Sequence, residues 1–125
     1  RSNNSYTDYN TPLYWTDYGN AQKTGQVIVG TIRKNIKQPE SKKFETVQRL
    51  PFVTEYVKGY TRYKEEESGP SCSLAEALGK QDLFVNSSLA HLGCSLLWKM
   101  FREGVIFFHG FYMNLDTMHV NPITL

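Results

Sequence analysis

The chain has 125 residues, of which 40% are apolar and 14% aromatic, and its formal net charge is +2. This length suits one domain with its own hydrophobic core, and the composition excludes a disordered or collagen-like chain. We therefore expect a single domain over residues 1–125. Residue 1 is Arg and no leader-like segment opens the sequence, which favours a processed or excised domain, part of a larger protein or complex.

The N-terminal stretch, residues 1–20, is rich in aromatic residues (Tyr6, Tyr9, Tyr14, Trp15 and Tyr18). We expect it to form an edge strand or an arm packed over the core, and an exposed aromatic surface for a partner is the alternative. Thr24-Gly25 reads as a turn, and the β-branched run Val27–Ile32 after it predicts a strand.

Two further strands are predicted in the middle of the chain. The first covers Lys43–Leu50, although a helix over 42–50 with Ser41 as its cap is an alternative. The second runs from Phe52 or Val53 to Lys64, with a bend at Gly59. Ser73-Leu74-Ala75-Glu76 has the form of a capping box and predicts a short helix that Gly79 closes.

The most apolar part of the chain, residues 87–115, predicts a core helix followed by a strand. Lys99, Arg102 and Glu103 interrupt it, so it does not read as a transmembrane segment. Asn86, Ser87 and Ser88 supply candidate N-cap oxygens, and Gly104 suits the C-terminal end. On a helical projection a broad apolar face opposes a polar strip of His91, Ser95, Lys99 and Arg102. The expected apolar face consists of Leu89, Ala90, Leu92, Gly93, Cys94, Leu96, Leu97, Met100 and Phe101.

Beyond Gly104, the run Val105–Met113 predicts an interior strand with a bulge at Gly110. Asn114 to Thr117 then turn the chain into a final strand, Met118–Leu125, whose Pro122 favours the edge of the sheet. Together these elements predict an α+β fold. We expect a mainly antiparallel sheet, one long core helix and one short helix packed on a face, and a C-terminal β-hairpin.

The two cysteines leave the compartment open. Cys72 and Cys94 fit neither a zinc pair nor a redox dithiol motif, and in a secreted protein they would form a disulfide. Asn3-Asn4-Ser5 and Asn86-Ser87-Ser88 match the glycosylation pattern. An intracellular location is the first expectation and secretion the alternative.

No phosphate-binding loop, nucleophile elbow, paired-His helix motif or calcium loop occurs in the sequence. We expect no cofactor and no metal site. Of the histidines, His91 reads as a surface residue and His109 as a hydrogen-bonded core residue. His109 and His119 do not approach each other in any hairpin register with a two-residue or three-residue turn.

Three functional hypotheses follow. The first is a non-enzymatic interaction domain whose partner is another protein. The second is a single-stranded nucleic-acid or polyanion binder, because ten basic residues face only three acids between Lys23 and Lys64. Its predicted binding residues are Arg33, Lys34, Lys37, Lys42, Lys43, Tyr56, Tyr60 and Tyr63. The third is a small enzyme that uses His109 or His119, for which no partner acid or nucleophile is identifiable.

Overall fold

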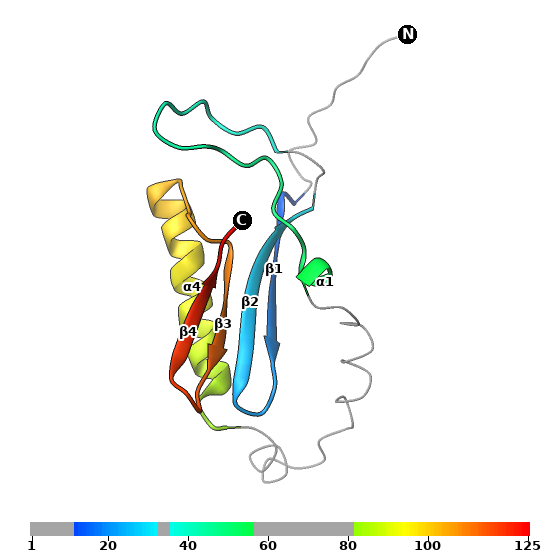
Figure 1. Cartoon of the computed structure of the whole chain (residues 1–125), viewed down its shortest axis with the longest axis vertical. Coiled ribbons are helices and arrows are strands. Elements are labelled where there is room, and N and C mark those ends of the chain that lie inside the picture. The colour runs from blue at the N-terminus through cyan, green and yellow to red at the C-terminus, as the bar shows by residue number, and fades with distance from the viewer. Residues whose placement is uncertain (1–11, 33–35, 57–81) are drawn as a thin grey trace.

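The structure is a computed structural model that describes residues 12–32, 36–56 and 82–125. Its elements are β1 (Tyr14–Asn20), β2 (Thr24–Thr31), α1 (Val53–Tyr56), α4 (Val85–Glu103), β3 (Gly110–Asn114) and β4 (His119–Ile123). The strands form one antiparallel sheet in the order β1-β2-β3-β4 (Figure 1). The predicted α+β fold, with its antiparallel sheet, long helix and C-terminal hairpin, is confirmed.

The strand register divides the buried residues into two clusters, one on each face of the sheet. Val27 pairs with Phe111 and shares its face. These two residues pack with Val85 and Leu89 of α4 in the first cluster. The next residue, Ile28, points to the opposite face, where Val53 of α1 and Ile123 of β4 cover it. The two helices therefore lie on opposite faces, whereas the sequence suggested helices on one face. The short helix predicted at residues 73–79 lies outside the described residues.

An Asx turn precedes helix α4 and a left-handed glycine ends it. Its C-terminal end follows the prediction, because Gly104 adopts a left-handed conformation (φ 68°) and its N–H donates to the Met100 carbonyl. The predicted N-cap residues are wrong. The helix begins at Val85, and the carboxylate of Asp82 accepts the Phe84 N–H at 3.0 Å, as in an Asx turn.

The buried side of α4 is narrower than the predicted apolar face. Its buried residues are Val85, Leu89, Gly93 and Leu96. Cys94, which we expected to face the core, is an exposed free thiol, and Phe101 is 75% exposed. The reason is geometric, because a single helix on a sheet buries one side and cannot bury a face that spans most of its circumference.

The middle of the chain departs most from prediction. Residues 43–50 form neither the predicted strand nor the alternative helix. The physical reason is that β2 is already paired with β1 and β3, so the sheet offers this segment no free edge there. Ser41 does accept the N–H groups of Lys43 and Phe44, but the turn does not continue. Residues 53–56, predicted as strand, form α1, and the remainder of that predicted strand lies outside the described residues.

Edge positions are as expected for β1 and β4. Of the N-terminal stretch 1–20, the structure describes residues 12–20, in which β1 is an outer strand of the described sheet, and Pro122 lies on the other outer strand, β4. β3 begins only at Gly110. Gly110 pairs with Ile123, and the His109 N–H also donates to the Ile123 carbonyl. Two residues of one strand thus lie opposite one residue of the other, as in a β-bulge. The hairpin turn holds the four residues Leu115 to Met118, which is one residue later than the predicted turn over Asn114–Thr117 and longer than the turns considered for the register of His109 and His119.

Candidate binding surfaces

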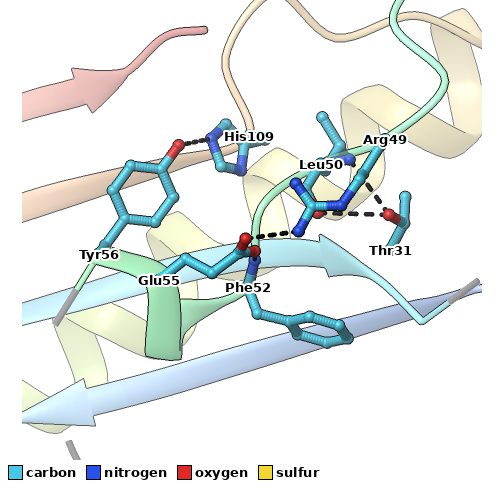
Figure 2. A network of polar contacts seen from close by, with 7 residues as sticks. All are labelled: Thr31, Arg49, Leu50, Phe52, Glu55, Tyr56 and His109. Carbon is cyan, nitrogen blue, oxygen red and sulfur yellow. Dashed lines mark hydrogen bonds and ion pairs between the residues drawn. The ribbon is translucent and has the colours of Figure 1, made fainter. Parts of the chain in front are cut away.

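His109 is the most buried histidine of the described residues, at 1% exposure, and both of its ring nitrogens have partners. Its Nδ1 lies 2.9 Å from the carbonyl oxygen of Val29. Its Nε2 lies 2.8 Å from the hydroxyl of Tyr56, as Figure 2 shows. A carbonyl oxygen only accepts, so Nδ1 carries the proton and, in the neutral ring, Nε2 accepts the Tyr56 proton. Burial raises the pKa of Tyr56, with smaller contributions from Tyr112 and Glu55.

The segment that carries Tyr56 is tied to the sheet by a short polar network (Figure 2). Thr31 exchanges backbone and hydroxyl hydrogen bonds with Leu50 at 3.0 to 3.3 Å. Glu55 accepts the Phe52 N–H at 2.6 Å and forms an ion pair with Arg49. These hydrogen bonds lower the pKa of Glu55, with Arg49 the larger cause and Phe52 the smaller. The capping-type signal of a Glu three residues after Phe52 marks α1 in the sequence, and we missed it.

This arrangement gives His109 a structural role. A general base needs a free ring nitrogen within reach of a substrate, and here Tyr56 occupies Nε2. His119 pairs with Asn114 at the far end of the hairpin and is exposed, so it does not support His109. Among the described residues no three His, Cys, Asp or Glu side chains gather as metal ligands would.

An apolar groove of about 250 Å³ lies between α4 and β4. It exists because α4 packs over β1, β2 and β3 and leaves the α4-facing side of β4 open, so that Val120 remains 48% exposed. The Lys99 ammonium stands 5.7 Å from the centre of the Phe108 ring at this groove. The groove is lined by Leu92, Ser95, Leu96, Lys99, Phe108, Phe111, Val120 and Pro122. Sequence reasoning missed it, because the lining comes from three separate segments.

The outer edge of β4 offers few backbone groups for pairing. In an antiparallel strand, successive residues direct their N–H and C=O groups alternately to the two sides. The Val29 N–H donates to the His109 carbonyl, and the Leu115 N–H donates to the Lys23 carbonyl. Along β3, odd-numbered residues therefore direct their backbone groups toward β2 and even-numbered residues direct theirs toward β4. Val120 and Pro122 of β4 therefore direct their backbone groups outward. Pro122 has no N–H, which weakens the edge as a template for another strand.

The structure describes half of the predicted polyanion-binding residues. Lys37, Lys42 and Lys43 are exposed on the segment 36–50, which extends beyond the end of the sheet near the end of α4, whereas α1 lies on the other side of the molecule (Figure 1). Tyr56 of α1 is half-buried against His109, so the structure does not bring it together with these lysines. The other four residues, Arg33, Lys34, Tyr60 and Tyr63, lie outside the described residues.

Two aromatic residues that were not among the predicted binding residues, Phe44 and Phe107, lie near these lysines. Phe44 and Phe107 make an edge-to-face contact, with ring centres 5.2 Å apart. The Lys43 ammonium lies 5.2 Å from the centre of the Phe44 ring, and Phe107 is 65% exposed. We did not predict this cluster, because Phe107 was assigned to a buried strand.

No family model, curated protein or solved structure matches the chain. In the described part of the chain, no helix has both the length and the apolar character needed to cross a membrane.

Proposed function

We propose that this protein is a non-enzymatic interaction domain and that the groove between α4 and β4 holds an apolar segment of a partner protein. The observation that carries the proposal is the groove itself. Its wall residues Leu92 and Val120 are 38% and 48% exposed, so apolar side chains on both walls of the groove are accessible to a ligand. Concave apolar sites with few polar groups are typical of binding sites.

The polar groups of the groove indicate the chemistry of its ligand. Lys99 is the one charged residue in the lining, and Ser95 is the other polar one. An apolar side chain followed by a carboxylate would fill the groove and pair with the ammonium group. Because Pro122 blunts the edge of β4, we expect the ligand to bind through its side chains rather than as an added strand.

Selection of short random peptides displayed on phage against the purified protein tests this proposal. Enriched peptides should contain a bulky apolar residue next to Asp or Glu. Val120→Asp should weaken their binding by about tenfold or more, because it places a carboxylate in the apolar wall and repels the carboxylate of the peptide. Met118→Asp is the matched control, since Met118 is 79% exposed on the same hairpin and lies outside the groove lining. The proposal fails if no peptide is enriched or if both variants bind equally.

A second candidate function is single-stranded nucleic-acid or polyanion binding, which the Lys43, Phe44 and Phe107 cluster favours. Lysines bind phosphate groups and exposed rings can stack on bases. Replacing Lys42 and Lys43 with Gln should flatten the salt dependence of oligonucleotide binding by roughly 0.7 for each lysine that binds a phosphate. Phe107→Ala should weaken binding by about 1 to 3 kcal/mol and leave that slope unchanged. Absence of oligonucleotide binding at low salt would eliminate this candidate.

A further inference from the structure

The groove between α4 and β4 lies where a second helix would pack beside α4. Helix α4 contacts β1, β2 and β3, so it lies over the middle one of these strands, β2. Neighbouring strands are about 4.8 Å apart, which places β4 about 10 Å from β2 across the sheet. The axes of packed helices are about 8 to 10 Å apart. A helix packed against this flank of α4 would therefore lie over β4.

The wall that α4 contributes to the groove has the spacing of a helix-packing surface. It consists of Leu92, Ser95, Leu96 and Lys99. Because these residues follow one another at intervals of three, one and three, they occupy one flank of α4 over about two turns. Residues at such intervals form the ridges between which the side chains of a neighbouring helix pack. The flank is therefore suited to contact another helix.

The floor of the groove is the face of β3 and β4 that points toward α4. Phe111 belongs to the core cluster under α4, and Pro122 is its partner on β4. Val120 lies two residues before Pro122, so its side chain points to the same face, where it is 48% exposed. The floor therefore offers apolar contacts to a ligand.

This apolar lining favours a ligand whose backbone needs no hydrogen-bond partners from the groove. Among the lining residues, only Ser95 and Lys99 have polar side chains. An extended segment would place its peptide N–H and C=O groups against apolar side chains, where unpaired polar groups are costly. The edge of β4 pairs with such a segment poorly, because Pro122 has no N–H. A helix pairs these groups within itself, so it can bury one side in the groove without that cost.

We propose that the partner segment is an amphipathic α-helix that lies beside α4 and over β4. This inference rests on the proposed function of the groove and adds the conformation and the sequence pattern of its ligand. Bulky apolar residues recur at intervals of three or four on the side of the ligand helix that faces the groove. An Asp or Glu next to one of them lies on the flank of that side, where it pairs with Lys99.

The tightest-binding peptide from the phage selection, labelled with fluorescein, is the probe that tests the helix. In an alanine scan followed by fluorescence anisotropy, losses of about tenfold or more should recur at intervals of three or four residues. Proline at a central position that the scan shows to be tolerant should weaken binding about tenfold or more, because it breaks a helix. α-Aminoisobutyric acid at the same position favours a helix and is the matched control, which should bind at least as tightly as the parent peptide.

Variants of the protein test the position of the ligand beside α4. Leu92→Asp should weaken the probe about tenfold or more, because it places a carboxylate in the wall of the groove. His91→Asp is the matched control, since His91 is exposed on the same turn of α4 and lies outside the lining. Lys99→Glu should weaken the probe about threefold, and replacing the acidic residue of the probe with Lys should restore that loss.

The outcomes separate this inference from the proposed function on which it rests. Losses at every second position, with proline tolerated, would show an extended ligand and overturn the helix while the groove remains a peptide site. If no peptide is selected, both proposals fail. Dimerisation of the free protein that Leu92→Asp abolishes would assign the groove to a second copy and would also overturn the inference.

Discussion

His109 and Val29 form a closed pair in which an imidazole N–H takes the place of a peptide N–H. The Val29 N–H donates to the His109 carbonyl at 2.7 Å, and the Nδ1–H of the His109 ring donates to the Val29 carbonyl at 2.9 Å. The His109 backbone N–H is thereby free to donate to Ile123 of β4. One residue thus links the two strands on either side of β3, where the regular ladder is interrupted.

The first prediction concerns this pair. His109→Leu should lower the free energy of unfolding by about 2 to 4 kcal/mol, because the Val29 carbonyl and the Tyr56 hydroxyl both lose their partner. Tyr56→Phe should cost only about 1 kcal/mol, since it leaves the bond to Val29 intact. Urea denaturation followed by circular dichroism measures both values. If both variants lower the free energy of unfolding equally, the hydrogen bond between the His109 ring and Val29 does not stabilise the sheet.

Gly110 gives a second prediction. A Cβ atom there would lie 2.3 Å from the Val27 carbonyl oxygen and 3.1 Å from the Ile28 Cα, and both atoms belong to the backbone of β2. Gly110→Ala should therefore destabilise the protein by about 3 kcal/mol. At the control position Gly19, a Cβ would meet only the Gln26 side chain at 3.4 Å, so Gly19→Ala should be nearly neutral. If Gly110→Ala has the melting temperature of the wild type, the β2 backbone does not approach Gly110 as closely as described.

The third prediction is a pH dependence at α1. The hydrogen bond from Arg49, and then that from the Phe52 N–H, lower the pKa of Glu55 below 4.5. A carboxylate with a lowered folded-state pKa contributes its full stabilisation above 4.5 and loses it as the pH falls through the folded-state value. The Phe52 amide resonance should therefore titrate below pH 4.5 in the wild type and lose this step in Glu55→Gln. If the Phe52 amide instead titrates at the ordinary pKa of a glutamate, the hydrogen bonds from Arg49 and Phe52 do not stabilise the Glu55 carboxylate.

Cys94 provides the fourth prediction. Because its thiol is exposed and free on α4, a maleimide should modify Cys94 in the native protein without reductant. Cys72 lies outside the described residues, so the disulfide proposed for a secreted protein remains a prediction that the same experiment tests. An unmodified Cys94, together with a mass two hydrogens lower than that of the reduced chain, would establish the bridge.

Local signals in the sequence identified the elements that depend on local chemistry. The end of α4 at Gly104, the strand around Val27 and the position of Pro122 follow from backbone preferences that need no distant partner. The strand predicted at 43–50 failed because β propensity does not reveal whether a sheet edge is free. Cys94 and Phe101 were placed in the core because hydrophobicity alone does not tell which apolar side of a helix the sheet will cover.

The candidate sites were harder to predict than the fold, because they depend on long-range placement. The groove needs Leu92 of α4, Phe108 of the connection and Val120 of β4 in one place. The bond between Tyr56 and His109 joins segments that no sequence motif connects. The excess of lysines near residue 42 correctly marked an exposed segment, but nothing in the sequence indicated that Phe107 would lie beside it.

The strand order has a consequence for how the chain folds. The hairpins β1–β2 and β3–β4 are each built from neighbouring residues, yet the centre of the sheet joins Ile28 to Gly110 across most of the chain. Closing so long a loop is slow compared with forming a hairpin. During synthesis, β2 must therefore wait with one edge unpaired until β3 has emerged from the ribosome, and this interval is when the nascent chain is most exposed to wrong pairing.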